Sequence, residues 1–276
     1  MSSEEEPFLT IFTPNYNGSK FISETIESVL NQTYSNFEYI IIDDCSTDNS
    51  WQIIQNYANK DNRIKPYKNT RNLHIVKTRN RGFKLSSSNA KYYAIIDSDD
   101  VALPYRFKVQ VEFLEKNPDF GLVGSDTIII NENSQIIGFR KYPSTNNEIR
   151  KVITRINPIA QSSVTLRKKA IEEVGMYDLN WKVAQDYDYW LRVGILWKIG
   201  NIKRPLIKYR LSKTQIKKTH LKVNIQNSFK IQKKALTVYG YKDRLYNKFF
   251  RILMRIISIF PKFIYFLYKI KIRIFR

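Results

Sequence analysis

Three carboxylates follow one apolar run of the chain. Residues 92–96 (YYAII) are followed within four positions by Asp97, Asp99 and Asp100. A short run of Tyr, Ala and Ile bounded by Ser and Asp predicts a buried strand that ends at a polar edge. Ionising three neighbouring carboxylates is costly unless a cation or a hydrogen-bonding ligand compensates the charge. The alternative is a helix N-cap before Pro104, but a cap needs one aspartate, so the pattern favours a site.

Two earlier apolar runs end in the same way. Residues 8–13 (FLTIFT) are followed by Pro14 and Asn15, and residues 38–42 are followed by Asp43 and Asp44. Ligands of an open parallel sheet bind outside the carboxyl ends of its strands. Carboxylates there could accept hydrogen bonds from a ribose and a base, and Mg²⁺ or Mn²⁺ could bridge to phosphates. The chain has no glycine-rich phosphate loop, so a metal would have to neutralise the phosphates of a sugar nucleotide.

Helical patterns separate these runs. Apolar residues recur at helical spacing after each of the first two runs, and a helix is expected over 76–85, just before the third. Strands this apolar, separated by helices, predict an α/β fold with a parallel sheet covered on both faces. Residues 120–131 and 135–142 predict two further strands of a mixed extension, and a later helix is expected to stop at Gly175.

Composition limits the kinds of site and compartment. The chain has 276 residues, which is enough for one large α/β domain with an appendage. Cys45 is the only cysteine, and His74 and His220 are far apart, which excludes a disulfide framework and a cysteine-based metal site. The acidic start, MSSEEEPF, lacks a signal-peptide pattern, so a cytoplasmic protein is expected.

The positive charge is concentrated at one end of the chain. The net charge is +21, yet residues 201–276 hold 21 Lys and Arg against one acid, which is +20. The first 200 residues hold the remaining 25 basic and 24 acidic groups, or +1. The sequence therefore predicts a nearly neutral body with a strongly cationic tail.

Four motifs in this order resemble one family. TPNYNG, IIIDDCSTDNS, TRNRGF and YYAIIDSDD are together similar to the family 2 glycosyltransferases of the GT-A fold, over roughly the first three quarters of the chain. The resemblance implies a GT-A fold, with a mixed, mainly parallel sheet flanked by helices. It also implies transfer of a sugar from a nucleotide-diphosphate sugar.

The resemblance assigns roles to the residues of these motifs. Asp43 and Asp44 would bind the nucleotide base, and Asp97 and Asp99 the ribose and the metal-bridged diphosphate. The resemblance also assigns Pro14, Asn15 and Arg79 to the donor site. For Arg79, an ordinary solvated helix charge is an equal alternative. Mn²⁺ or Mg²⁺ is expected at Asp99 and Asp100, with the ligating oxygens left open.

A later motif supplies the expected base. An inverting transfer needs a group that takes the proton of the attacking acceptor hydroxyl, and a carboxylate can do this. In QDYDYWLRV, residues 185–193, the family resemblance makes Asp186 that base, although Gln185 stands where the family commonly has Glu. Asp188 is the alternative carboxylate. Without the resemblance, the same segment is typical of an amphipathic helix with Asp186 as its cap.

The tail is expected to bind a membrane surface. Aromatic and aliphatic residues alternate with Lys and Arg, and no window of about 18 residues is free of charge, which argues against a spanning helix. This pattern favours an amphipathic helix on anionic lipid. A helix covering the core and nucleic-acid binding are the alternatives. Nucleic acid ranks lower because no recognised motif for it is present.

Together these patterns predict two segments and one leading function. Residues 1–212 would form the GT-A catalytic domain, and residues 213–276 a basic, helical, membrane-associating extension. The leading function is inverting, metal-dependent sugar transfer to a cell-surface glycan or glycolipid, of lipopolysaccharide, capsule or O-antigen type, on the inner face of the membrane. Two other classes are a nucleotidyltransferase of similar topology and a non-enzymatic basic membrane or nucleic-acid adaptor.

Overall fold

The computed structural model describes residues 6–211 and 218–258. Along the chain the elements follow in the order β1 (Leu9–Asn15), α1 (Ile22–Leu30), β2 (Phe37–Asp43), α2 (Ser50–Ala58), β3 (Ile64–Lys68), α3 (His74–Leu85), β4 (Tyr92–Ile95), β5 (Val101–Ala102), α4 (Arg106–Lys116), β6 (Phe120–Ile130), β7 (Ile136–Arg140), α5 (Asn146–Val152), a 3₁₀ turn η1 (Gln161–Ser163), β8 (Thr165–Arg167), α6 (Lys168–Val174), α7 (Gln185–Leu196), β9 (Lys198–Arg210), α8 (Lys218–Thr237) and α9 (Leu245–Ser258).

One mixed sheet runs through the molecule in the order β3-β2-β1-β4-β8-β6-β9-β5, with β7 paired to β6. Its first four strands pair in parallel. β8 pairs antiparallel to both β4 and β6, and β9 then runs parallel to β6. The mixed α/β fold predicted from the sequence is confirmed, with the wholly parallel part in the N-terminal half.

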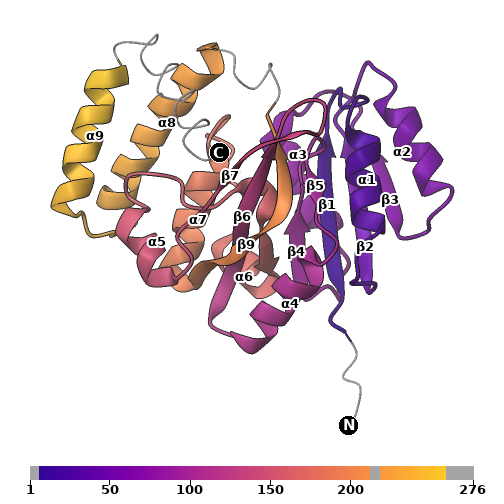
Figure 1. Ribbon diagram of the computed structural model, residues 1–276, viewed down its shortest axis with the longest axis horizontal. Helices are drawn as coiled ribbons and strands as arrows, with labels where there is room; N and C mark the ends of the chain where they lie inside the picture. Colours follow the sequence, from indigo (N-terminus) through magenta and orange to yellow (C-terminus); the bar gives the residue numbers. More distant parts are fainter. Residues whose placement is uncertain (1–5, 212–217, 259–276) are drawn as a thin grey trace.

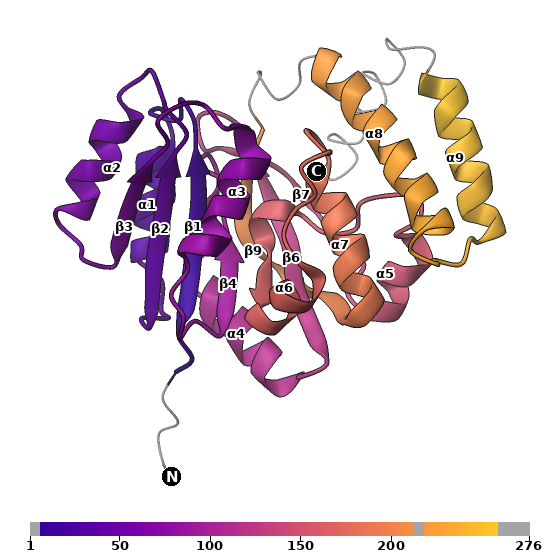
Figure 2. The ribbon, with the colours of Figure 1, turned by 180° about the vertical axis from the view of Figure 1, so that it is seen from behind.

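Strand periodicity explains why both faces of this sheet are covered. Leu9 and Ile11 of β1 point into the core under α1, α2 and α4, while Phe12 points into the core under α3, α6 and α7. Successive side chains of a strand alternate between faces, so a strand that is apolar at nearly every position must be buried on both. Figure 1 shows α1 and α4 in front of the sheet, and Figure 2 shows α3, α6 and α7 on the opposite face.

Two features between the predicted motifs show how local sequence sets the element ends. α6 ends as expected at Gly175, whose φ of 79° lies in the left-handed region that suits glycine. α5, which the sequence patterns did not predict, starts with a capping box. Thr145 accepts from the backbone N–H of Glu148, and the Glu148 carboxylate accepts from the Thr145 N–H.

β9 is the largest element that the sequence patterns missed. It spans 13 residues and carries Pro205 and several basic side chains, so it lacks a clean apolar alternation. It fills the sheet between β6 and β5. Because β5 immediately follows the acidic run at residues 97–100, β9 brings a distant part of the chain to the edge where the site was predicted.

The described part of the cationic extension packs on the body at one end of the sheet. Ile231 and Ala235 of α8 are fully buried in the core under α7, and Asn247 of α9 donates to the carbonyl of Lys151 at 3.0 Å. In Figures 1 and 2, α8 lies between α7 and α9. Across the described helices, none has the length and apolar content needed to span a membrane. Predictions for residues 259–276 lie outside the described residues.

Candidate active site

The carboxyl ends of β1, β2 and β4 meet at one edge of the sheet, as their parallel pairing requires. Asn15 stands opposite Asp43 in the β1–β2 register, and its Nδ2 donates to Oδ1 of Asp43 at 2.9 Å. The Ile96 amide, just after β4, donates to the Phe12 carbonyl at 3.0 Å. The polar residues that follow the three strands are thereby brought side by side.

A cavity of about 1050 Å³ opens at this edge. Six of the residues predicted for the donor site line it, namely Pro14, Asn15, Asp44, Arg79, Asp97 and Asp99. The first turns of α3 form another wall, and Lys182 also lines the cavity. A cavity of this size and composition is suited to a nucleotide-sized ligand.

Asp43 and Asp44 have different tasks in this arrangement. Asp43 is fully buried and accepts from Asn15 and from the Ser46 amide at 3.0 Å, so it organises the loop after β2. Asp44 lines the cavity, and its Oδ1 accepts from the Leu73 amide at 2.8 Å. Asp44 therefore fixes the start of α3, where the chain enters the cavity wall.

The acidic run after β4 is divided between the cavity and the interior. Asp99 lines the cavity, and burial together with the neighbouring charge of Asp97 raises the pKa of its carboxyl to about 6. Asp100 is 1% exposed, and burial raises the pKa of its carboxyl well above the usual range. None of these aspartates caps a helix, because α4 begins at Arg106 with Tyr105 as its N-cap. The cap alternative is therefore wrong.

Arg210, at the end of β9, holds this run from behind. Its amide donates to Oδ1 of Asp100 at 2.8 Å, and its Nε donates to the Asp99 carbonyl at 2.7 Å. The guanidinium is fully buried and also forms an ion pair with Glu24. Arg210 thus fixes the backbone of the acidic run while leaving the Asp99 carboxylate at the cavity.

Arg79 is a buried site residue and not a solvated charge on the surface of α3. Its side chain is 4% exposed, and its Nη2 donates to Oδ1 of Asp97 at 2.6 Å. Burial alone would lower the pKa of this guanidinium, but Asp97, Tyr177 and Asp186 together outweigh burial, so the pKa is raised. The buried Nε has no hydrogen-bond partner among the residues that the structure describes. Arg79 is therefore charged and has a donor left for a ligand.

A second cavity, of about 580 Å³, adjoins the first. Asp186, near the start of α7, lines this second cavity together with Asn157. Four residues line both cavities, namely Ile75, Arg79, Asp97 and Lys182. The structure therefore brings the predicted base next to the predicted donor site, although about 90 positions separate Asp97 from Asp186 in the sequence.

The surroundings of Asp186 favour a proton acceptor with an elevated pKa. Burial raises the pKa of this carboxyl, while the Arg79 charge and a hydrogen bond from Asn157 partly offset the effect. Asn157 Nδ2 donates to Oδ2 of Asp186 at 2.7 Å. Ala184 precedes α7 with a φ of 62°, and no side chain caps this helix. Asp186 is therefore held by Asn157 and does not act as a helix cap.

Asp188, the alternative base, is directed elsewhere. Its side chain is fully buried, and its carboxylate accepts from Arg192 at 3.1 Å and from Lys234 and Tyr239 of the extension at 3.2 and 2.8 Å. Both carboxylate oxygens are thus bound to groups within the fold. Asp188 fixes α7 against α8, and Asp186 is the acid of this motif that lines the cavity.

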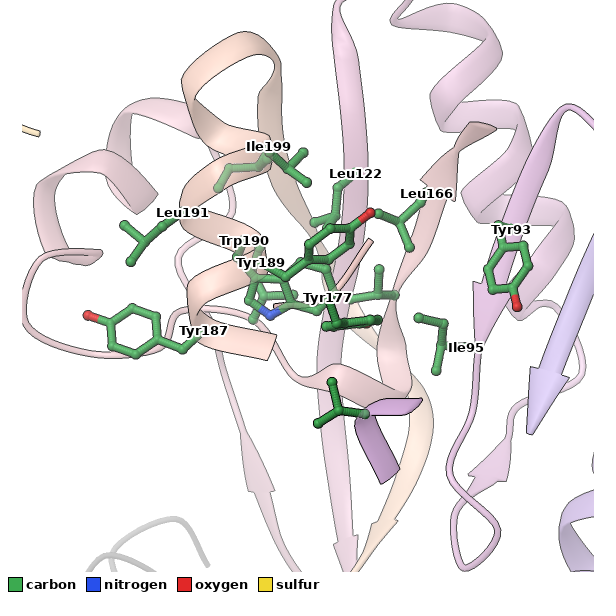
Figure 3. Packing of buried hydrophobic residues seen from close by; sticks show 14 of the residues in the cluster. Tyr93, Ile95, Leu122, Leu166, Tyr177, Tyr187, Tyr189, Trp190, Leu191 and Ile199 are labelled. Carbon is green, nitrogen blue, oxygen red and sulfur yellow. The ribbon is translucent and has the colours of Figure 1, made fainter. Parts of the chain in front are cut away.

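An aromatic cluster supports α7 from the core. The rings of Tyr177 and Tyr189 lie 4.4 Å apart between centroids, and Phe83 of α3 stacks on Tyr177 at 5.7 Å. Figure 3 shows Tyr177, Tyr189 and Trp190 packed together beside Leu122 and Leu166 of the sheet. These contacts join α3, which carries Arg79, to α7, which carries Asp186, in one rigid unit.

The donor set is compatible with a divalent cation held mainly by the substrate. Within residues 6–211 and 218–258, no group of three or more His, Cys, Asp or Glu side chains is arranged around a common point. Mg²⁺ commonly takes one or two protein carboxylates and completes its shell with phosphates and water. Asp99 fits this pattern because its crowded carboxyl lines the cavity. The Oδ2 of Asp100 has no hydrogen-bond partner in the described part of the chain, but Asp100 is buried and does not line the cavity.

Three residues of the site were missed from the sequence. Asn157 precedes a proline, which is typical of a turn, and Lys182 and Arg210 resemble ordinary surface charges. Only the fold shows that Lys182 lies between two cavities and that Arg210 is buried. The spacing of charges along the sequence held no signal that could have distinguished them.

Comparison with known proteins places the chain in a family. Residues 10–175 match the family described as "Glycosyl transferase family 2". An uncharacterized glycosyltransferase of Haemophilus influenzae is 31% identical over 245 residues, covering 86% of this chain and 75% of that protein. The O-antigen biosynthesis glycosyltransferase WbnJ of Escherichia coli is 31% identical over 242 residues, covering 83% of this chain and 90% of that protein.

Solved structures agree in fold. The crystal structure of S. aureus TarS 1–349 in complex with UDP aligns with a TM-score of 0.59 and 18% identity, covering 87% of this chain and 76% of that chain. This likeness supports the GT-A architecture alone. The family match covers more than half of the chain, and both relatives are 31% identical over most of their length, so the chain belongs to glycosyl transferase family 2.

Proposed function

We propose that this glycosyltransferase transfers a sugar, with inversion, from a nucleotide-diphosphate sugar to a hydroxyl of a cell-surface glycan or lipid-linked acceptor. One observation carries this proposal. The cavity with the donor-site residues and the cavity with Asp186 share Arg79 and Asp97 in their common wall. A donor in the first cavity and an acceptor in the second would meet at this wall.

The first cavity would bind the donor, with uridine as the proposed nucleoside. Asp44 and the first turn of α3 would offer acceptors and donors to a base, and Asp97 and Asp99, which line the same cavity, would be near the ribose and the diphosphate. TarS, which shares the fold, has been solved with UDP and with UDP-GlcNAc. The unpartnered Nε of Arg79 supplies a positively charged donor for a phosphate oxygen.

In the second cavity, Asp186 would act as the base of a single displacement. The acceptor oxygen forms a bond to the anomeric carbon, the bond from that carbon to the β-phosphate oxygen breaks, and the acceptor proton passes to Asp186. Asn157 orients the Asp186 carboxylate by donating to its Oδ2. Arg79 and Lys182 provide positive charge toward the departing nucleoside diphosphate.

Asp99 would hold the divalent cation, which when bound supplies positive charge against the diphosphate. Oδ1 of Asp97 accepts from Arg79 Nη2 at 2.6 Å, so Asp97 would act in the donor site by holding Arg79 in place. Asp100 keeps the backbone of the run in place through the Arg210 amide. We therefore assign the metal to Asp99, with Asp100 as its structural support.

The extension would place the enzyme on a membrane. The outer side of α9 exposes Leu245, Tyr246, Phe249, Ile252, Leu253 and Ile256, of which Phe249 is 64% exposed. The polar Asn247 and Arg251 of the same helix are buried against the body instead. Since residues 213–276 carry 17 Lys and Arg and one acid, this apolar face with its positive charge suits anionic lipid of the cytoplasmic leaflet.

The proposed acceptor class draws on relatives and on this membrane face. WbnJ of Escherichia coli is named for O-antigen biosynthesis, and TuaG of Bacillus subtilis, 27% identical over 249 residues, for teichuronic acid biosynthesis.

Thermal unfolding with UDP-, GDP- and dTDP-sugars and Mn²⁺ tests the donor proposal, because a bound ligand raises the midpoint by mass action. A rise with UDP-sugars is expected. Equal midpoints with all three classes and with buffer alone would contradict it.

A further inference from the structure

The second cavity is lined by more positive than negative side chains. Four basic and two acidic residues line it, which leaves a net charge of +2, and these are Arg79, Arg140, Lys141, Lys182, Asp97 and Asp186. Arg79 and Asp97 compensate each other at 2.6 Å. The other charged residues that line the cavity are Asp186 and three cations, Arg140, Lys141 and Lys182. A cleft lined mainly by one sign of charge concentrates ligands of the opposite sign.

The donor accounts for only part of this positive charge. Lys182 and Arg79 line both cavities, so a donor diphosphate can use them. Arg140, the last residue of β7, and Lys141, which follows it, line the second cavity and are not part of the wall of the first. Arg140 interacts with the side chain of Tyr142 in the same wall. These two cations are on the acceptor side of the site.

The same cavity has a wall from the extension. Asn224 and Ser228 of α8 line it, and Asn227 donates from Nδ2 to the carbonyl of Val183 at 3.1 Å, just before α7. The side of the second cavity that receives the acceptor is thus built from β7, the segment before η1 and α8. Arg140 and Lys141 bring charged donors to this side, and charged donors match an anion better than a neutral ring.

We propose that the acceptor carries an anionic group, a carboxylate or a phosphate, beside the hydroxyl that is glycosylated. Arg140 and Lys141 compensate this group, while the hydroxyl is directed to Asp186. The inference rests on the proposed function and specifies its acceptor. Without these cations, an anionic acceptor would be repelled by the Asp186 carboxylate that must take its proton.

Binding of three matched probes to the full chain, saturated with UDP, tests this inference. Saturation-transfer NMR would give dissociation constants for methyl β-D-glucuronide, methyl β-D-glucoside 6-phosphate and neutral methyl β-D-glucoside. At least one charged probe is expected to bind about fivefold or more tightly than the neutral one. A preference for the glucuronide identifies a carboxylate, and a preference for the phosphate identifies a phosphate. Equal affinities, or no detectable binding of either charged probe, overturn the proposal.

The variant Lys141→Glu identifies the residues responsible, with Lys60→Glu as a matched control. Lys60 is an exposed lysine just beyond α2, at the far end of the sheet. Lys141→Glu is expected to remove most of the preference for a charged probe, whereas Lys60→Glu keeps it. A preference that persists in Lys141→Glu overturns the proposal. UDP affinity is measured on the same samples. If the wild type does not bind UDP, the proposed function has failed. If it binds UDP but shows no preference for a charged probe, only the acceptor inference has failed.

Discussion

Arg79 of α3 and Asp97 after β4 form an ion pair of 2.6 Å in the wall between the two cavities. The guanidinium is 4% exposed, whereas the Asp97 side chain is 29% exposed. The arginine is thus fixed in the interior and presents the carboxylate toward the cavities. This pair joins α3, whose first turns line the first cavity, to the acidic run that follows β4.

Replacing Arg79 by Lys should impair catalysis more than it impairs folding. Lysine keeps the charge but cannot reproduce the planar guanidinium that contacts Asp97 and retains a free Nε. We expect kcat/KM to fall by about 10- to 100-fold, which corresponds to about 1.4 to 2.8 kcal/mol. Steady-state transfer from a UDP-sugar measures this. Arg63→Lys is the matched control, because Arg63 pairs with Asp61 at 2.7 Å away from both cavities. Equal losses in both variants would contradict a specific role for Arg79.

Asn157 should set the pH at which the enzyme becomes active. Its hydrogen bond to Asp186 favours the ionised carboxylate, so Asn157→Ala should raise the pKa of Asp186 further. A base must be deprotonated to act, and therefore the acid limb of kcat/KM should move to higher pH. The other groups that act electrostatically on Asp186, or that it acts on, are Arg79, Asp97, Tyr142 and Tyr177.

The pH profile from pH 4.5 to 9 distinguishes this role from a structural one. A purely structural role would lower the rate at every pH without displacing the limb. The matched substitution is Asn56→Ala, at an exposed asparagine of α2 whose side chain accepts from Gln52 Nε2 at 2.9 Å, and it should leave the limb in place. An unchanged limb in Asn157→Ala would refute the positioning role.

Asp99→Asn should weaken the activation of transfer by a divalent cation. The substitution removes the carboxylate that lines the donor cavity but keeps its size. Titration of the wild type with Mn²⁺ or Mg²⁺ after chelation should restore transfer, and the variant should respond at least about tenfold less. Asp119→Asn, in an exposed pair with Lys198, is the control. Full activity of the chelated wild type would exclude a metal at Asp99.

The exposed face of α9 should govern membrane binding. The double substitution Phe249→Ser and Ile252→Ser removes two large apolar side chains that are 64% and 46% exposed. Partition onto vesicles with anionic lipid should fall at least about tenfold, since burying each such side chain contributes about 1 kcal/mol or more. Sedimentation with vesicles measures it, and Ile136→Ser, at 57% exposure in β7, is the control. Unchanged binding would contradict this membrane face.

The acidic strand ends could be predicted because their signal is local. An apolar run that stops at Asp43 or Asp97 indicates a strand and its polar end within a few residues, and parallel pairing then brings such ends together. The family resemblance supplied Asp186, which periodicity alone would have left as part of a helix. Strand ends and motif order were therefore enough for the donor edge and the mixed fold.

Residues that depend on distant pairing could not be predicted in the same way. Arg210 contacts the Asp99 carbonyl from 111 positions away, and in the sequence it is one basic residue among many. Asn157 lies in a loop whose place beside α7 follows only from the packing of the whole second half of the chain. The burial of polar Asn247 and the exposure of Phe249 in α9 also depend on which side of that helix meets the body.

Asp186→Asn tests the account most directly. Burial raises the pKa of this carboxyl, so its ionised form costs folding stability that grows as pH rises through that pKa. A neutral asparagine should therefore leave the unfolding midpoint at neutral pH unchanged or higher, which separates catalysis from folding.

The decisive measurement is the rate at which labelled sugar passes from a UDP-sugar to a membrane fraction of the source organism. Loss of a general base lowers such rates by about 10²- to 10⁴-fold. We predict a loss in this range for Asp186→Asn, with UDP affinity retained and with the anomeric configuration inverted in the wild-type product. Transfer by Asp186→Asn at the wild-type rate, or a wild-type product that retains the configuration of the donor, would contradict the account.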